Sequence, residues 1–220
     1  MAGTERLNAC WKYFGPPKRL AHATFENYIP KTKQQAAALN ICQSYCLDKI
    51  LTGQGLMLVG SWGSGKSHLS VATARSLIQT APEKYGVRQD EQNVYNPDNP
   101  NQIKYEGIYC SFFSVVELLD ALRPGSEAKQ RRGEALFHRA KADQLVVLDD
   151  IGVEKPTDWV AERLYAVVDT RYRMERATIF TSNCSEKELT NQLGGRLVSR
   201  IYEMAEPVQV IGPDHRRKMA

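Results

Sequence analysis

Residues 60 to 67 place glycines, a lysine and a hydroxyl group at a spacing that can bind phosphate. Gly60, Gly65, Lys66 and Ser67 fit the pattern G-x-x-x-x-G-K-S/T, and Gly63 adds a glycine inside the loop. Glycines without Cβ let successive backbone N–H groups turn toward one phosphate, at the positive end of the helix that follows. In such a loop the lysine reaches the β- and γ-phosphates and the serine hydroxyl binds Mg²⁺. The expected phosphate contacts are Gly60, Gly63, Ser64, Gly65, Lys66, Ser67 and His68.

Two adjacent acids end a second apolar run. Residues 145 to 148 are continuously apolar and β-branched, as in a strand buried on both faces of a parallel sheet, and Asp149 and Asp150 follow. Phosphate chemistry needs one acid to hold Mg²⁺ and a second to orient the attacking water. We expect Asp149 to serve the metal and Asp150 to act as the base. The alternative is a pair of acids on a surface turn.

Three further polar groups could act on the same phosphate. Asn183 follows the strand-like run 177 to 180 and could hold the attacking water, although asparagine is also a common turn residue. Arg196 and Arg200 are four residues apart on one helical face, where an arginine can act on a neighbouring subunit or remain an ordinary surface cation. Arg216 could reach the nucleotide of its own chain. Residue type alone leaves these alternatives open.

Strand-like runs alternate with helix-like runs along the chain, which predicts a doubly wound α/β fold with a central parallel sheet flanked by helices. The predicted strands are 56 to 59, 108 to 112, 145 to 148, 177 to 180 and 208 to 211. The predicted helices are 32 to 51, 68 to 80, 115 to 122, 126 to 142, 157 to 174, a segment capped at 185, and 196 to 204. Ser114 and Ser185 each begin a capping-box pattern.

Composition indicates an ordinary globular domain. The chain has 220 residues with a net charge of +4, so any nucleic-acid surface must be a local patch. No run approaches 18 apolar residues and no secretory signal opens the sequence, so we expect a cytoplasmic protein. The five cysteines form no C-x-x-C pair; Cys42 and Cys46 lie one helical turn apart without a completing ligand. We expect reduced, mostly buried thiols.

Segments outside the predicted core have less distinct patterns. Residues 1 to 30 contain several prolines and a basic Lys18-Arg19 pair, and we expect an irregular leader. Within it, Phe25 and Tyr28 could stack on a base or simply dock on the core. Residues 81 to 107 are rich in Pro, Asn, Gln and Asp and predict a surface insertion. Residues 126 to 142 predict a basic amphipathic helix.

Five segments together resemble AAA+ ATPases, in order their Walker A, Walker B, sensor 1, arginine-finger box and sensor 2. They are Gly-Ser-Trp-Gly-Ser-Gly-Lys-Ser, Leu-Val-Val-Leu-Asp-Asp-Ile-Gly, Thr-Ser-Asn, Gly-Gly-Arg-Leu-Val-Ser-Arg-Ile and Gly-Pro-Asp-His-Arg-Arg. The chain is most similar to bacterial replicative-helicase loaders of the DnaC/DnaI type, and to the related IstB-type transposition helper ATPases. Thr-Phe-Glu-Asn-Tyr resembles the start of that group's domain. The resemblance spans about residues 23 to 218.

The resemblance implies a Mg²⁺-dependent ATPase that binds ATP and ADP. It implies Asn183 as sensor 1, Arg200 as the finger acting in trans, with Arg196 supporting that interface, and Arg216 as sensor 2. It divides the chain into residues 1 to 22, a leader or remnant of a helicase-binding region, and an AAA+ domain over residues 23 to 220. Family members usually carry a separate N-terminal domain, so residues 1 to 22 could also mark a fragment.

The implied partners are a replicative DNA helicase, single-stranded DNA and further copies of the chain in an ATP-dependent homo-oligomer. For DNA, the sequence offers cations near stacking groups, although a solvated helix face would look the same. These residues are Lys129, Arg131, Arg132, Arg139, Phe137 and His138. The alternative functions are an IstB-type transposition helper and a nucleotide-gated binding adaptor with negligible hydrolysis.

Overall fold

A five-stranded sheet forms the centre of the molecule. The computed structural model describes residues 2–80, 109–153 and 157–215. The described strands run in the order β2-β3-β4-β1-β5, and every neighbouring pair is parallel. Their bounds are β1 Gly55–Val59, β2 Cys110–Ser114, β3 Leu145–Asp149, β4 Ala177–Ser182 and β5 Ala205–Gln209. The predicted α/β class with a central parallel sheet is confirmed.

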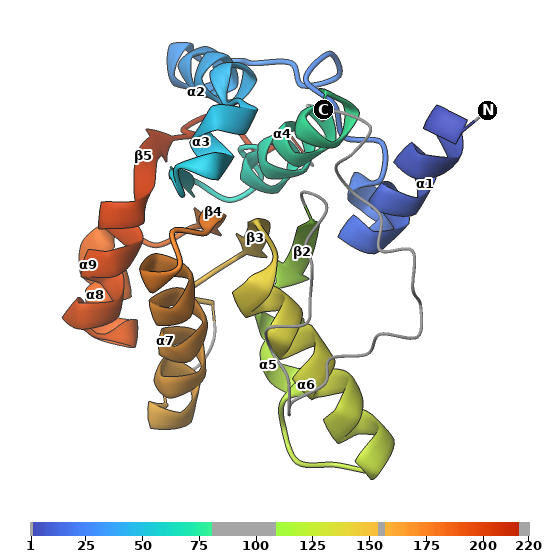
Figure 1. Cartoon of the computed structure of the whole chain (residues 1–220). Coiled ribbons are helices and arrows are strands. Elements are labelled where there is room, and N and C mark those ends of the chain that lie inside the picture. Colours follow the sequence, from blue (N-terminus) through green and yellow to red (C-terminus); the bar gives the residue numbers. More distant parts are fainter. Residues whose placement is uncertain (1, 81–108, 154–156, 216–220) are drawn as a thin grey trace.

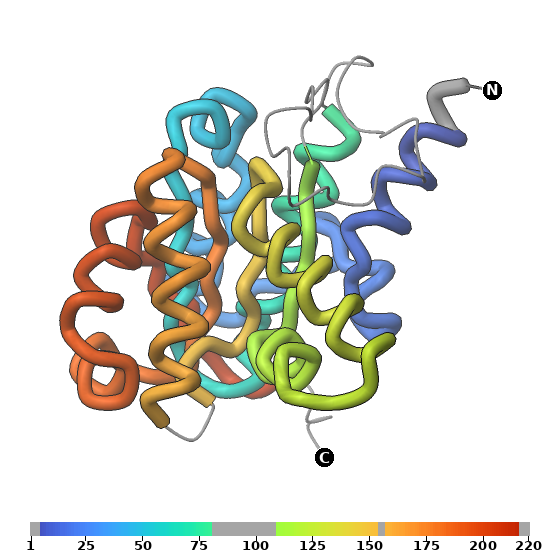
Figure 2. The backbone as a smooth tube through the Cα atoms, turned by 60° about the horizontal axis from the view of Figure 1, so that its bottom comes forward, coloured from blue at the N-terminus to red at the C-terminus, as the bar shows by residue number. Residues whose placement is uncertain are grey.

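Helices cover both faces of this sheet and complete a three-layer sandwich (Figure 1). One face is covered by α1 Ala2–Phe14, α2 Lys33–Ser44, α3 Leu47–Leu51 and α4 Lys66–Thr80. The other is covered by α5 Val115–Ala121, α6 Glu127–Ala142, α7 Asp158–Arg173, α8 Glu186–Leu193 and α9 Gly195–Met204. Figure 2 shows the strands between these two layers, with α1 beside β2 at one edge.

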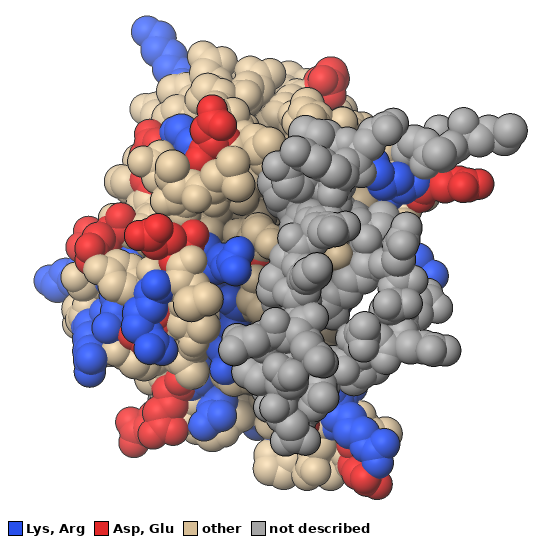
Figure 3. All heavy atoms as spheres, in the orientation of Figure 1, with Lys and Arg blue, Asp and Glu red and all other residues tan. Residues whose placement is uncertain are grey.

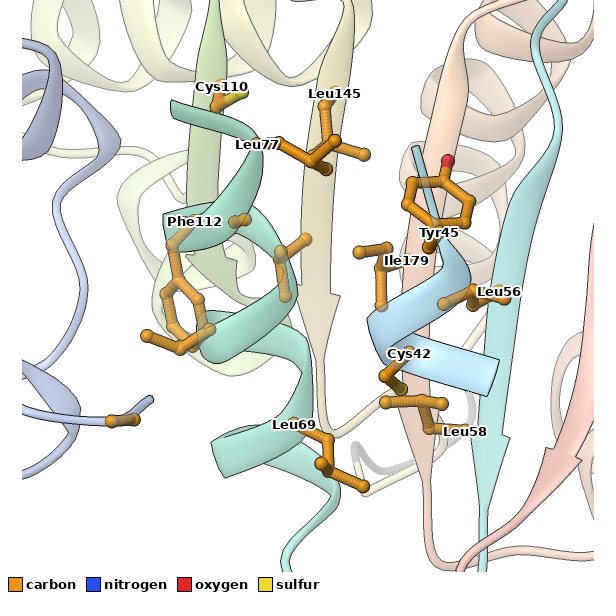
Figure 4. Close-up of a cluster of buried hydrophobic side chains, with 14 of the residues drawn as sticks. Cys42, Tyr45, Leu56, Leu58, Leu69, Leu77, Cys110, Phe112, Leu145 and Ile179 are labelled. Carbon is orange, nitrogen blue, oxygen red and sulfur yellow. The ribbon is translucent and has the colours of Figure 1, made fainter. Parts of the chain in front are cut away.

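Side chains of each strand alternate between two hydrophobic clusters, which is why the strands read as unbroken apolar runs. Leu56 and Leu58 of β1 pack with α4 in one cluster, while Met57 and Val59 point into the cluster beneath α7 and α9. Figure 4 shows the first cluster, where Leu69 and Leu77 of α4 face the strands. All five β1 residues are buried. Because β1 is buried on both faces, its position in the sheet fixes where the glycine-rich loop begins.

The N-terminal region differs from the prediction. Residues 2–14 form α1, so the expectation of an irregular segment over residues 1 to 30 is wrong there. Cys10 and Phe14 are one turn apart and buried, with the Phe14 ring edge-on to Phe112 of β2 at 6.0 Å. Leu7 and Trp11 pack against the same cluster, so Leu7, Cys10, Trp11 and Phe14 form one apolar face at helical spacing that the sequence analysis overlooked. Packing against β2 and α4 stabilises it.

Several element boundaries also differ. The helix predicted over residues 32 to 51 is two helices, because Tyr45 is extended and turns its buried side chain to donate a hydrogen bond to the Gln54 carbonyl. Ser114 lies at the N-cap of α5, but its side chain makes no capping hydrogen bond, so that capping box is wrong. The capping box at Ser185 and Glu188 is confirmed. The surface insertion predicted at residues 81 to 107 lies outside the described residues.

Arg171, near the end of α7, is a buried cation that ties the amino ends of β3 and β4 to α6. Its guanidinium donates to the Thr178 hydroxyl at 2.8 Å and to the carbonyls of Ala140, Asp143 and Ala177 at 3.1, 2.8 and 2.6 Å. The side chain is fully buried, and burial lowers the pKa of Arg171 to about 9. These bonds satisfy carbonyls at the edge of the sheet opposite the glycine-rich loop.

Replacing Arg171 with Met should cost more than about 3 kcal/mol of unfolding free energy, because several buried acceptors would lose their donors together. Urea denaturation followed by circular dichroism measures this. Arg173→Met is the matched control on the same helix: its side chain is 67% exposed and pairs with Asp169, so it should change stability by less than about 0.5 kcal/mol. Equal losses for the two variants would contradict the role assigned to Arg171.

None of the helices in the described ranges combines the length and apolarity needed to cross a membrane.

Candidate functional site

The glycine-rich loop leaves the carboxyl end of β1 and turns directly into α4, as the spacing predicted. Gly60 lies so close to the Val210 carbonyl that a Cβ would come within 2.1 Å of it. Gly63 and Gly65 have φ angles of +71° and +100°, which L side chains rarely adopt. Lys66 begins α4, so the loop's backbone N–H groups lie at the helix N-terminus. The loop therefore has the geometry of a phosphate cradle.

Lys66 connects the loop to the end of β4. Its side chain is only 5% exposed, and Nζ donates to the carbonyls of Gly60 and Ser61 at 3.0 and 2.8 Å and to Asn183 Oδ1 at 2.7 Å. These acceptors place the ammonium group inside the loop. An ammonium group in this position can bind an anion that enters the loop.

Asp149 lies directly beside Ser67. Its carboxylate accepts a hydrogen bond from the Thr181 hydroxyl at 2.8 Å. Burial raises the pKa of Asp149, the nearby Ser67 hydroxyl opposes the rise, and the neighbouring Asp150 charge adds to it. A hydroxyl and a carboxylate at one point are the hard oxygen ligands that Mg²⁺ prefers. Ser67 and Asp149 are therefore the residues that would hold a magnesium ion.

Asp150 has an unusual backbone conformation for a non-glycine residue, with φ of 62°. Its N–H donates to Thr181 Oγ1 at 2.8 Å, and its Oδ1 accepts from Asn183 Nδ2 at 3.3 Å. Such conformations are costly and concentrate at functional sites. Asn183 thus joins Lys66 on one side to Asp150 on the other, a network that adjacent strand ends assemble.

These groups line a pocket of about 590 Å³, within the range of ordinary ligand sites. The predicted site residues that face it are Gly63, Gly65, Lys66, Ser67, His68, Asp150 and Asn183. Gly60, Ser64 and Asp149 lie behind this lining; Ser64 is fully buried, so only its backbone is positioned to act. His68 lies at the rim, where its Nε2 is 2.8 Å from the Thr24 carbonyl.

The segment before α2 forms the opposite wall. Tyr28 is 5% exposed; its hydroxyl donates to the Ser64 carbonyl at 2.9 Å, and its ring lies between those of His68 and His215. Burial raises the pKa of Tyr28 to about 12. Gln35 Nε2 donates to the same carbonyl at 3.1 Å. The structure therefore shows Tyr28 docked on the domain, one of the two alternatives given for it. Its ring also lines the pocket.

The chain is similar in sequence and fold to proteins that are named as helicase loaders. The chain is 25% identical over 177 residues to the replicative helicase loader DnaI of Bacillus subtilis, covering 74% of this chain and 48% of that protein. It is 22% identical over 180 residues to the replicative helicase loader DnaC of Escherichia coli, covering 82% and 63%. A crystal structure of the DnaC helicase loader superposes with a TM-score of 0.66 at 27% identity, over 88% of this chain and 99% of that one.

In sequence and fold the chain is similar to AAA+ proteins of the DnaC/DnaI type. The order of its motifs agrees with this similarity. The match spans between about half and two thirds of the length of these two curated relatives. No family model matches the chain.

Within this AAA+ domain, Arg200 lies on α9 and not in the pocket. Its guanidinium pairs with Asp169 Oδ1 at 2.9 Å, donates to the Tyr165 hydroxyl and lies over the Tyr165 ring at 4.8 Å. Arg196 lies over the same ring at 5.1 Å, so the two arginines share one face as predicted. Basic and acidic side chains intermingle over α8 and α9 (Figure 3). Arg216 lies outside the described residues, but His215 reaches the pocket rim.

The basic helix proposed to bind DNA is α6, and several of its basic side chains pair with other groups of the chain. Arg139 turns inward and donates to the Tyr13 carbonyl at 2.6 Å and to Ser111 Oγ at 2.8 Å. Lys129 pairs with Asp120, and Arg131 pairs with Glu127. The expectation that Arg139 is a surface cation is wrong, because its charge offsets that of the buried Asp143 at 3.8 Å.

The remaining α6 residues named in the sequence divide by exposure. Arg132 is exposed, while Phe137 and His138 are half-buried. Phe137 packs on the hydrophobic cluster beneath α6 and α7, and Lys141 lies over its ring at 4.5 Å. Arg132 is thus the best-exposed cation of the set proposed for DNA.

The burial of the cysteines agrees in part with the expectation of mostly buried thiols. Cys10, Cys42 and Cys110 are buried thiols outside any disulfide, whereas Cys46 is exposed and Cys184 half-buried. Burial raises the pKa of Cys42 to about 12. No group of three or more His, Cys, Asp or Glu side chains suited to a metal occurs among the residues with described positions.

Sequence reasoning missed Thr181, Gln35 and Arg19. Thr181 stands one strand away from Asp149 and bonds both neighbouring acids. The sequence shows a threonine near the end of the strand that precedes Asn183. Which acids this threonine faces depends on the order of the strands in the sheet. Arg19 and Gln35 come from segments far from the loop in sequence, so no spacing indicates them.

Proposed function

We propose that this chain is an ATP-dependent loader of a replicative DNA helicase that hydrolyses ATP and contacts single-stranded DNA. The observation that carries the proposal is the network of Lys66, Asn183 and Asp150 beside the Ser67–Asp149 pair. It joins a phosphate cradle to an acid and an amide placed to hold water. The named helicase loaders among its relatives supply the biological context.

Each side chain has a defined part in cleaving the γ-phosphate. Asp150 accepts the proton of the attacking water, and Asn183 holds that water through its amide. Lys66 stabilises the charge that develops on the phosphate oxygens as the bond to the leaving diphosphate breaks. Ser67 and Asp149 would hold Mg²⁺, which neutralises phosphate charge when bound. The elevated pKa of Asp149 means that this metal site weakens as the pH falls.

The arginine for the transition state comes from a second copy. Arg200 lies on α9 and pairs with Asp169 of its own chain, outside the pocket lining. A finger that acts in trans must lie on a surface that a neighbouring subunit can approach, and Asp169 and Tyr165 keep the guanidinium in one orientation there. We therefore expect hydrolysis in an ATP-dependent homo-oligomer and little in the monomer.

An adaptor that binds ATP without hydrolysing it would need no water-positioning groups. The strained Asp150 and its bond to Asn183 favour the hydrolysing function. A transposition helper would use the same ATP site on double-stranded DNA. Measuring affinity for single- and double-stranded DNA across a salt titration separates that function from the loader.

The decisive experiment is capture of the host's replicative helicase on the immobilised chain with ATP, with ADP and without nucleotide. Wild type should retain helicase with ATP and release it as ATP is consumed, because hydrolysis ends the bound state. Asp150→Asn should retain it without release. Equal capture under all three conditions would contradict the loader, and an Asp150→Asn protein with normal activity in replication would favour the adaptor.

A further inference from the structure

Arg19 brings a second basic group to the nucleotide pocket from outside the AAA+ motifs. It lies in the short 3-10 helix η1, Lys18–Leu20, between α1 and the segment that carries Tyr28. Its side chain is exposed and lines the same pocket as Lys66, Ser67 and Asp150. Among the described residues Arg19 forms no hydrogen bond or ion pair, so its donors remain available to a ligand.

Arg19 shares its pocket with the glycine-rich loop. Gly63, Gly65, Lys66 and Ser67 line the same cavity of about 590 Å³. In such loops the lysine reaches the terminal phosphates and the hydroxyl serves their Mg²⁺. A guanidinium group that lines this cavity is therefore available to those phosphates.

The segment that carries Arg19 is firmly attached to α4, so the position of Arg19 is set by the fold. Arg75 of α4 donates to the Ala23 carbonyl at 2.9 Å and to the Ala21 carbonyl, and its guanidinium lies over the Trp11 ring of α1 at 3.8 Å. Asn27 Nδ2 donates to the His22 carbonyl at 2.8 Å and closes the following turn. Arg75 thus ties α1 and the residues after η1 to the helix that begins at Lys66.

We propose that Arg19 binds the terminal phosphate of ATP in cis, so that the segment joining α1 to the domain senses whether the nucleotide is a triphosphate or a diphosphate. This inference rests on the proposed ATP site and goes beyond it. An arginine presents a planar set of donors that matches phosphate oxygens. Because Arg75 holds this segment against α4, bound ATP would restrain residues 18–23 further, and ADP would not.

The test compares Arg19→Ala with Lys18→Ala, a control in the same 3-10 helix whose side chain does not line the pocket. Calorimetry measures the affinity of each full-length protein for a non-hydrolysable ATP analogue and for ADP. Arg19→Ala should bind the analogue about tenfold more weakly and ADP less than about threefold more weakly, because one charge-assisted contact is lost. Lys18→Ala should match wild type for both, and Arg19→Lys should recover part of the discrimination.

Hydrogen exchange of residues 18–23 gives a second measurement. The ATP analogue should slow exchange there in wild type but not in Arg19→Ala. Equal weakening for both nucleotides, or unchanged affinity for both, would overturn the role of Arg19 while leaving the ATP site intact. Failure of wild type to bind either nucleotide would overturn the ATP site and this inference together.

Discussion

Lys66→Ala should abolish measurable ATP hydrolysis and weaken ATP binding by about 10- to 100-fold, the value of one or two contacts to a charged phosphate. The ammonium group is 5% exposed inside the loop, where its charge is weakly screened. Isothermal calorimetry with a non-hydrolysable analogue and a phosphate-release assay measure both effects. The loss should be larger for ATP than for ADP, since lysine in such loops reaches the terminal phosphates.

Lys49→Ala is the matched control for this experiment. Lys49 lies in α3, before β1, and pairs with Glu206 at 3.4 Å on the surface away from the pocket, so its loss should leave nucleotide binding unchanged. Thermal unfolding of both variants checks the fold. Nucleotide affinity that survives Lys66→Ala in a folded protein would place the phosphates elsewhere.

Asp150→Asn and Arg200→Ala should each reduce the turnover rate by about 100-fold or more, for different reasons. Asparagine keeps the shape of the side chain but cannot accept the proton of water, so ATP affinity should persist. Arg200→Ala should also leave ATP affinity intact in the monomer, because Arg200 pairs with Asp169 outside the pocket lining. Single-turnover hydrolysis measured against protein concentration gives both rates.

Mixing the two inactive variants tests whether Arg200 acts in trans. In the mixture, an Arg200→Ala subunit supplies a pocket with intact Asp150, and an adjacent Asp150→Asn subunit supplies an intact Arg200. An equal mixture should therefore recover a substantial fraction of wild-type turnover. Arg173→Ala is the control, because Arg173 pairs with the same Asp169 at 3.0 Å but is 67% exposed. Should the mixture remain as inactive as its components, Arg200 acts within its own chain or has no catalytic part.

Local spacing in the sequence was enough to predict the phosphate cradle and the class of fold. The chemistry of a glycine-rich loop lies within eight consecutive residues, 60 to 67, and strands buried on both faces appear as continuous apolar runs. The carboxyl ends of parallel strands share one edge, so Asp149, Asp150 and Asn183 were expected near the loop without knowledge of the strand order. The structure brings all three there.

Only the tertiary structure decided which charges are free to act. Arg139 and Arg19 are both basic residues in polar stretches of sequence, yet one is committed beside Asp143 and the other is exposed in the pocket. Likewise the apolar face of α1 is visible in the sequence, but its packing partners, β2 and α4, are set by the tertiary structure. Contacts between residues more than a hundred positions apart depend on how helices cover the sheet, and the type and spacing of nearby residues do not encode that arrangement.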